Sequence, residues 1–464
     1  MKRIAIVGGG ISGLAAAFAL EKRRRAGVAL EYTLFESSSR LGGVFVSERI
    51  EGCLVEAGPD SFLTEKPWAA ELCRETGLGD QLIGSNDRDR KTSILVKGRL
   101  APMPEGLMFM VPTRMLPVLW SPLFSNHTRF RMAREWFQAP RESSEDESVA
   151  AFVERHYGAE VVDRLADPLL SGVYGGEADK LSLRAVLPRF AEMEARHGSL
   201  GRALISAKPT AAVAGKPLFT SLKDGMQQMV EAVVSHLPPP ALHIDTPVQA
   251  LQQQDTSWVV SAGYASDQFD AVILATSTQA AARLGLPAKL SGALGEIAYT
   301  SSITVALAYD QAVRKALPPG FGFLIPRSEG KRLLAATFVH NKFPHRAPAD
   351  RALIRCFLGG ARDPGILEQP DNEILRIVRQ ELREILNLAA EPLFTRVFRW
   401  KDAMAQYNVG HIERIKAIEN ACHELPGLAL AGNAYHGIGV PDCVRSGTEA
   451  AASVLRSVGL PGPE

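Results

Sequence analysis

A glycine-rich turn at residues 8–13 limits most strongly what the chain can fold into. An apolar run at residues 2–7 is predicted to form a buried strand before the turn, and a helix is predicted to begin at its end. Gly8 permits a tight turn, Gly10 lets the backbone approach a pyrophosphate, and Gly13 allows close packing of helix and strand. The first N–H groups of such a helix favour a bound phosphate. The pattern predicts a dinucleotide site formed by Gly8, Gly10, Ile11, Ser12 and Gly13.

An acidic residue follows at the distance that a ribose requires. Glu36 ends a predicted second strand, about twenty residues beyond the last glycine of the turn. A carboxylate there can accept hydrogen bonds from a ribose 2′-hydroxyl and would repel a 2′-phosphate, so NADP is disfavoured. Arg40, Gly42 and Gly43 then complete the pattern E-x-x-x-R-x-G-G.

The composition is that of a large enzyme without a nucleic-acid surface. The chain has 464 residues, 46% of them apolar, and a net charge of +1, which suggests about three domain-sized units. It has no basic stripe with interleaved aromatic residues, so no nucleic-acid partner is expected. The five cysteines and ten histidines lack metal and disulfide spacings, so no metal site is predicted. Glycines and a basic helix end interrupt the N-terminal apolar run, and we therefore expect an uncleaved cytoplasmic chain.

The C-terminal part contains a second strand, glycine-rich turn and helix. The strand is predicted at residues 428–431, the turn at residues 437–440, and the helix from Ser446 to Val454. The helix amides can face a ligand, or the segment is only a helix entry. A middle piece contains a further predicted strand at residues 243–248.

The two ends of the chain together resemble the flavin amine oxidase superfamily. The pattern from Glu36 to Gly43 is similar to its second flavin signature, and residues 432–440 are similar to its C-terminal flavin motif. The resemblance implies FAD as cofactor, and noncovalent attachment because the attachment cysteine before Gly437 is absent. Carried over to this chain, the flavin contacts are Glu36, Arg40, Gly42, Gly43, Val248, Gly432, Ile438, Gly439 and Val440.

Five further blocks are similar to those of the porphyrinogen oxidases within this superfamily. The blocks are residues 58–62, 171–176, 320–326, 343–348 and 406–411, and they follow the family's order. The resemblance implies flavin contacts at Gly58, Pro59, Asp60, Ser61 and Trp400. It also implies a substrate pocket that includes Gly172, Leu324, Thr337, Phe357 and Thr92.

Two of these pocket positions depart from the family pattern. Thr92 stands where the family often has an arginine that pairs with a substrate propionate, and Thr337 stands where it has a leucine. Arg88, Arg90 and Lys91 are close to Thr92, and they are interpreted either as a replacement or as solvated loop charges. The residue that anchors the propionate therefore stays unassigned.

The resemblance implies oxygen-dependent oxidation of protoporphyrinogen IX to protoporphyrin IX in haem biosynthesis. Six electrons would pass as hydride to the flavin, which oxygen reoxidises with formation of hydrogen peroxide. Oxidation of coproporphyrinogen III is the alternative, followed by an amine oxidase, a carotenoid desaturase and a flavoprotein without turnover. No catalytic base is assigned, because His340, His411 and His436 are each isolated and isolated histidines are usually structural. A homodimer is expected from the resemblance alone.

These observations predict an α/β protein with a split, Rossmann-like FAD-binding domain, an inserted α/β substrate domain and an inserted, mainly helical domain. The FAD-binding domain is assigned to residues 1–60, 216–294 and 425–464. The substrate domain is assigned to residues 61–100, 196–215 and 295–424, and the helical domain to residues 101–195.

The helical insertion has two interpretations. Its apolar segments at residues 107–112 and 115–124 are too short and too broken by proline to cross a bilayer. Flanked by Arg114, Arg129, Arg131 and Arg134, they suit a peripheral contact with the cytoplasmic membrane. The same residues also suit a helical subdomain whose apolar face packs inward.

Overall fold

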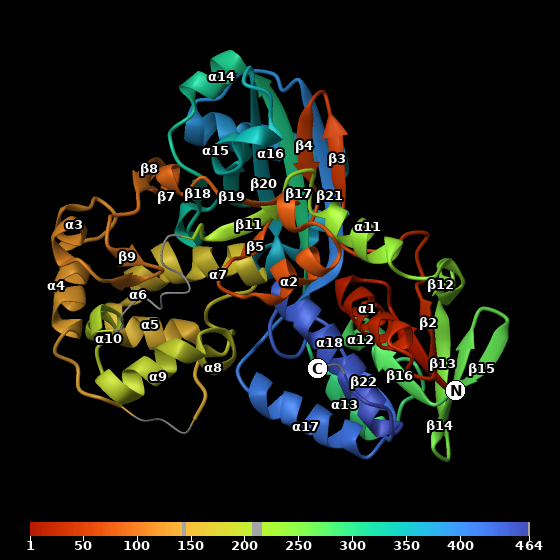
Figure 1. Ribbon diagram of the computed structural model, residues 1–464. Coiled ribbons are helices and arrows are strands. Elements are labelled where there is room, and N and C mark those ends of the chain that lie inside the picture. Colours follow the sequence, from red (N-terminus) through yellow and green to blue (C-terminus); the bar gives the residue numbers. More distant parts are fainter. Residues whose placement is uncertain (142–144, 207–215, 463–464) are drawn as a thin grey trace.

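The computed structural model describes residues 1–141, 145–206 and 216–462 (Figure 1). A parallel sheet lies near both termini, a seven-stranded sheet lies at the opposite end of the molecule, and a group of helices lies to one side. The predicted α/β class is confirmed. The bounds of the seven domain segments stay predictions, and residues 207–215 of the predicted substrate domain lie outside the described residues.

The parallel sheet is built from the beginning, middle and end of the chain. Its strand order is β12-β2-β1-β16-β22, and every neighbouring pair is parallel. The strands are β1 (Lys2–Val7), β2 (Leu30–Phe35), β12 (Leu242–His243), β16 (Ala271–Leu274) and β22 (Leu428–Leu430). Their carboxyl ends meet at one edge, which is where open α/β sheets bind ligands.

Helices and a small antiparallel sheet cover this parallel sheet. On one side α1 (Ile11–Arg25) packs against α18 (Val440–Ser457). The contact is so close that a Cβ at Gly447 would lie 2.0 Å from the Ser12 carbonyl oxygen. The elements around the sheet also include α2 (Trp68–Glu75), α11 (Gln227–Ser235), β13 (Val248–Gln254), β14 (Ser257–Ala262), β15 (Ala265–Phe269), α12 (Thr278–Ala281), α13 (Ala288–Gly295) and α17 (His411–His423).

Two predicted elements differ in extent from the structure. The strand predicted at residues 243–248 is wrong as one element: β12 ends at His243 and β13 begins at Val248. Asp245 between them has a φ of 50°, which an extended strand does not allow. The C-terminal helix begins at Val440 instead of Ser446, because Gly439 is extended and Pro441 suits the first helical turn.

The seven-stranded sheet has the order β21-β17-β20-β19-β18-β7-β8. Its strands are β7 (Thr92–Val96), β8 (Arg99–Pro102), β17 (Tyr299–Asp310), β18 (Gly322–Leu324), β19 (Leu333–Phe338), β20 (Arg351–Gly359) and β21 (Phe394–Ala405). One face packs against the apolar side of α16 (Asp371–Leu386), where Ile374, Val378 and Leu382 are buried. The other face of the sheet is directed toward α7 and the hairpin of β3 and β4.

The helices at the side form one apolar core. They are α3 (Met115–Trp120), α4 (Asn126–Glu135), α5 (Val149–Tyr157), α6 (Ala159–Val161), α7 (Asp167–Tyr174), α8 (Leu183–Val186), α9 (Pro188–His197) and α10 (Leu200–Ser206). Val118, Phe124 and Met132 are buried in this core, as the inward-packing interpretation expects. Within the described residues, no helix has the length and apolar character needed to cross a bilayer.

Short strands connect the three regions. The hairpin β3 (Ser47–Ile50) and β4 (Cys53–Glu56) shares a buried apolar cluster with β17 and β20 of the seven-stranded sheet. The other short elements are β5 (Phe62–Leu63), β6 (Leu82–Gly84), β9 (Leu107–Met108), β10 (Val111–Pro112), β11 (Phe219–Leu222), α14 (Gln311–Ala316) and α15 (Val339–Lys342).

Candidate active site

The glycine-rich turn lies at the carboxyl edge of the parallel sheet, between β1 and α1. A Cβ at Gly8 would lie 2.6 Å from the Ala275 carbonyl oxygen, and a Cβ at Gly13 would lie 1.9 Å from the Gly8 carbonyl oxygen. Both positions therefore exclude side chains. A Cβ at Gly10 would meet no atom within 4 Å, so the backbone at Gly10 borders open space. Ile11 and Ser12 form the first turn of α1 beside it, and this arrangement fits a diphosphate.

The acidic residue and the arginine of the second signature both bond to backbone near the turn. Glu36 accepts hydrogen bonds from the N–H groups of Gly9 (2.7 Å) and Ser38 (2.8 Å). Arg40 donates to the carbonyls of Gly43 and Phe45. Glu36 and Arg40 therefore hold two loops that border the turn.

The two glycines of the second signature allow close contacts at the same place. Gly42 has a φ of 101°, and a Cβ there would lie 2.9 Å from Val230. Gly43 lies next to the turn, since its Cβ would be 3.4 Å from Gly10 Cα. The glycine-rich turn and the second signature are thus adjacent, and their shared contact with one cofactor stays a prediction.

Residues 57–61 lie against the second signature, and we call them the flavin segment because the sequence predicts flavin contacts at residues 58–61. A Cβ at Gly58 would be only 1.9 Å from the carbonyl oxygen of Val44, the residue after Gly43. Pro59 follows, and the side chains of Asp60 and Ser61 point to Lys342 rather than to the glycine turn. Any contact of Asp60 or Ser61 with the flavin therefore falls to their backbone.

The remaining predicted cofactor residues come from distant parts of the chain. Val248 begins β13, and the nearby Thr246 N–H donates to the Glu36 carbonyl (2.8 Å), which places this segment beside the acidic residue. Ile438 and Gly439 precede α18, and Val440 is its first residue. Gly432 donates its N–H to Ser446 Oγ (3.1 Å), which fixes the turn after β22 to the same helix.

One face of the seven-stranded sheet carries the predicted substrate residues. The strand registers align Thr92 with Gly322 and Thr337, and they align Leu324 with Phe357 through Ala335. Residues that pair directly across neighbouring strands point to the same side. Helix α7 contacts β18 and β19, and a Cβ at Gly172 would lie 3.9 Å from Leu324. The five positions thus lie on or beside one face of the sheet, and their contact with a substrate stays a prediction.

The same face reaches the flavin segment through Trp400. The register places Trp400 opposite Ser302, on the side of Thr304 and Phe357. Its indole N–H donates to the Ala57 carbonyl at 2.9 Å. Substrate face and flavin segment are therefore joined by a hydrogen bond.

Several residues of the site were missed in the sequence. Tyr407 OH donates to the Asn433 carbonyl (2.9 Å) and accepts from the Gly437 N–H (2.7 Å). Lys66 Nζ bonds both carboxylate oxygens of Asp442, at 2.8 and 2.6 Å. Tyr407 lies in one of the blocks that resemble the family, at residues 406–411. Its hydrogen-bond partners are distant in the chain, so the sequence did not indicate its role. Lys342, Arg346 and Arg355 were missed for the same reason.

The three histidines considered as proton acceptors are His340, His411 and His436, and each contacts other parts of the protein. Burial lowers the pKa of His340 and of His411 to about 4, so both are neutral at physiological pH. His340 Nδ1 contacts the backbone of Leu353, and His411 stacks on Tyr407 at 3.9 Å between ring centres. His436 is exposed and pairs with Glu419. None of these three histidines is therefore assigned as a base.

Two cations lie directly before Thr92, the first residue of β7. Arg90 forms an ion pair with Asp87 (3.8 Å), while Lys91 is exposed. Among residues 1–141, 145–206 and 216–462, no group of three or more His, Cys, Asp or Glu side chains is placed to hold a metal ion.

Comparison with known proteins decides the family. The family model described as flavin containing amine oxidoreductase matches residues 11–455. The chain belongs to this family. Membership confirms the flavin-dependent oxidoreductase and the FAD cofactor predicted from the sequence.

Relatives of this flavin amine oxidoreductase span nearly its whole length. Coproporphyrinogen III oxidase of Bacillus subtilis is 34% identical, with 98% of each chain covered. Protoporphyrinogen oxidase 2 of Arabidopsis thaliana is 28% identical and covers 98% of this chain and 94% of its own. A crystal structure from Exiguobacterium sp. 255-15, provisionally named a protoporphyrinogen oxidase, has a TM-score of 0.88 at 30% identity, with 98% of each chain covered.

Proposed function

We propose that this enzyme oxidises a porphyrinogen to the porphyrin, with FAD as noncovalent cofactor and molecular oxygen as final electron acceptor. The observation that carries the proposal is the single sheet face with Leu324, Thr337 and Phe357, joined to the flavin segment by Trp400. When bound, FAD supplies the capacity to accept electrons. The names of the relatives over the whole chain support the proposal.

The chain's own task in this reaction is to hold two flat molecules in register. The glycine turn and Glu36 would hold the dinucleotide part of FAD, and the flavin segment with residues 438–440 would hold its ring. A substrate would then lie between α7 and the face that carries Phe357. Orientation of this kind accounts for large rate effects without a dedicated acid or base.

We infer coproporphyrinogen III as the first substrate to test. The relatives that are 34% and 33% identical, from Bacillus subtilis and Propionibacterium freudenreichii, are both named coproporphyrinogen III oxidases. Protoporphyrinogen IX, which the sequence analysis placed first, stays the second candidate because a 28% identical relative carries that name.

The test is to mix the FAD-loaded protein with each porphyrinogen in air and to follow porphyrin fluorescence. We expect at least one substrate to be oxidised faster than in the protein-free control. Phe357→Ala should lower kcat/KM about tenfold through loss of one aromatic contact. Tyr264→Ala, at a fully exposed aromatic side chain, is the matched control and should not change it. No acceleration of either substrate would reject the proposal.

We also propose a peripheral membrane contact at the outer side of the helical region. Leu116 and Trp120 on α3, and Phe130 and Phe137 next to them on and after α4, are 69–86% exposed. Arg114 and Arg134 add positive charge to this face, which suits anionic headgroups. The protein should sediment with phosphatidylglycerol vesicles, and Trp120→Ser/Phe130→Ser should not. Equal sedimentation of both proteins would contradict the contact.

The homodimer is a separate proposal, and light scattering of the purified protein tests it.

A further inference from the structure

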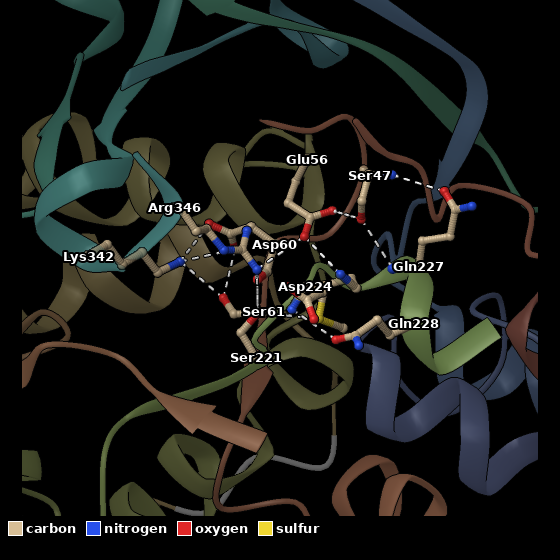
Figure 2. Close-up of polar contacts among 12 residues, drawn as sticks. Ser47, Glu56, Asp60, Ser61, Ser221, Asp224, Gln227, Gln228, Lys342 and Arg346 are labelled. Atoms are coloured by element: carbon tan, nitrogen blue, oxygen red, sulfur yellow. Dashed lines mark hydrogen bonds and ion pairs between the residues drawn. The ribbon is translucent and has the colours of Figure 1, made fainter. Parts of the chain in front are cut away.

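Five charged side chains meet between the flavin segment and the seven-stranded sheet. This Asp60 cluster consists of Glu56, Asp60, Lys342, Arg346 and Arg355; Figure 2 shows the first four. Lys342 Nζ lies 3.0 Å from both carboxylate oxygens of Asp60 and 3.0 Å from Ser61 Oγ. Arg346 Nη2 lies 3.1 Å from Glu56 Oε1. Glu56 is the last residue of β4, and Asp60 follows it in the flavin segment. Of the three cations, Lys342 ends α15, Arg346 follows that helix, and Arg355 lies on β20.

The cations also bind the backbone of the flavin segment. Arg355 Nη2 donates to the carbonyls of Ala57 and Gly58. Arg346 Nη2 donates to the Asp60 carbonyl at 3.2 Å, and Ser221 Oγ donates to the same oxygen at 2.7 Å. Three carbonyls of the segment are thus turned toward the sheet, and the conformation of the segment is fixed from that side.

The cluster is largely buried, and its cations favour the ionised form of Asp60. Arg346 is fully buried, Glu56 is 4% exposed, Arg355 is 6% exposed and Lys342 is 9% exposed. Burial opposes ionisation of Asp60, but Lys342, and then Arg355 and Arg346, hold the pKa of its carboxyl well below the usual range. A buried charge whose partner is removed is strongly unfavourable, so the members of the cluster hold one another in place.

Arg355 belongs to the substrate face as well. The register places it on the same side of β20 as Phe357, opposite Thr337. Its guanidinium carbon lies 4.9 Å from the centre of the Phe357 ring. One side chain therefore contacts both the flavin segment and a residue of the proposed substrate pocket.

We propose that Lys342 and Arg355 are positioning residues, which fix the flavin segment relative to the substrate face so that flavin and substrate meet in one register. This inference rests on the proposed oxidase function for its kinetic part only. Its flavin part concerns the environment of the bound cofactor and is independent of the substrate. Neither residue is assigned a contact with the reacting atoms.

The experiment compares four variants, each loaded with FAD. Lys342→Met removes the charge, Lys342→Arg keeps it, and Lys342→Met/Asp60→Asn removes both charges so that no carboxylate is left unpaired. Arg155→Met is the matched control, because Arg155 also bonds a largely buried carboxylate, Glu194, in the helical region. The readouts are the flavin absorption spectrum, its reduction potential, kcat and KM, measured well below each melting temperature.

The expected result separates positioning from plain stability. Lys342→Met and the double variant should shift the flavin spectrum and potential and should lower kcat by about ten- to a hundredfold, as small misplacements do. KM should stay within about twofold, because the pocket side chains are unchanged. Lys342→Arg should restore most of kcat. Arg155→Met should lower the melting temperature without moving the flavin readouts.

Two outcomes would overturn the inference. One is a wild-type flavin spectrum, potential and kcat in the double variant, which would make the cluster a stabilising contact only. The other is an Arg155→Met variant with the same flavin changes. If the wild-type protein oxidises no porphyrinogen, the proposed function fails, and the spectrum and potential still decide the role of Lys342.

Discussion

Two largely buried clusters of carboxylates and cations in this protein connect different regions of the structure. The Asp60 cluster joins chain segments nearly three hundred residues apart, at the boundary of flavin segment and sheet. The second, which we call the His156 cluster, joins Glu135, Arg155, His156 and Glu194 within the helical region. The first uses lysine and arginine as its cations, whereas the second includes a histidine. The comparison indicates that the two clusters depend on pH through different groups, since the pKa of Asp60 is lowered in the first and the pKa of His156 is raised in the second.

The largest effect is expected when the Asp60 cluster loses a cation. Arg346→Met should lower the free energy of unfolding by about 3–5 kcal/mol, because it leaves the buried Glu56 without its charged partner. Denaturant unfolding of the FAD-loaded protein measures it. A loss below about 1 kcal/mol would show that the cluster relaxes freely, and the contrast with the His156 cluster would disappear.

The His156 cluster should be the weaker of the two. Glu135→Gln should cost about 1.5–3 kcal/mol, because Glu135 accepts from the Leu200 N–H (2.5 Å) and Ser199 Oγ (3.0 Å) and faces His156 at 3.3 Å. The same denaturant titration is the measurement, and the flavin spectrum should not change. A changed spectrum would mean that the helical cluster also acts on the cofactor.

The two clusters should respond to pH in opposite directions. Burial opposes the charge of His156, but Glu135 and Glu194 raise its pKa above the ordinary value of 6.5. The contribution of His156 is therefore complete below about 6.5 and is lost as the pH rises through the raised pKa. Asp60 has a lowered pKa, so its contribution is present above the ordinary value of 3.8 and is lost as the pH falls.

The predicted loss of the His156 contribution at high pH is tested by the melting temperatures of the wild type and of His156→Gln between pH 6 and 9. The wild type should lose stability across this range relative to the variant. Parallel curves for the two proteins would contradict the assignment. Asp60→Asn is the corresponding variant below pH 5.

The smallest effect is expected at an exposed ion pair, which sets the baseline for both clusters. On α16, Arg376 Nη2 lies 2.6 Å from Glu373 Oε1 at the solvent-exposed surface. Arg376→Ala should leave the melting temperature within experimental error, since exposed pairs are screened. A drop as large as that of Glu135→Gln would mean that burial is not what distinguishes the clusters.

The sequence predicted those parts of the site that depend on neighbouring residues or on motif order. The roles predicted for Gly8 and Gly13 follow from local backbone geometry, and those predicted for Trp400, Phe357 and Thr337 were carried over from the family resemblance, at positions between its ordered blocks. The sequence did not reveal the Asp60 cluster, although Asp60 and Arg346 each lie in a quoted block. Nothing local to either residue specifies a partner that is 286 positions away. The early start of α18 was available from Pro441, which is favoured in a first helical turn.

The order of strands in the parallel sheet has a consequence for how the protein is made. The residues of β1 are synthesised first, but β16 and β22 must join its sheet, and α18 must cover α1, before the cofactor surface is whole. A ribosome therefore has to release residues 428–457 before this surface can close. Until then the alanine-rich side of α1 that packs against α18 stays uncovered, and exposed apolar surface of this kind is prone to aggregation.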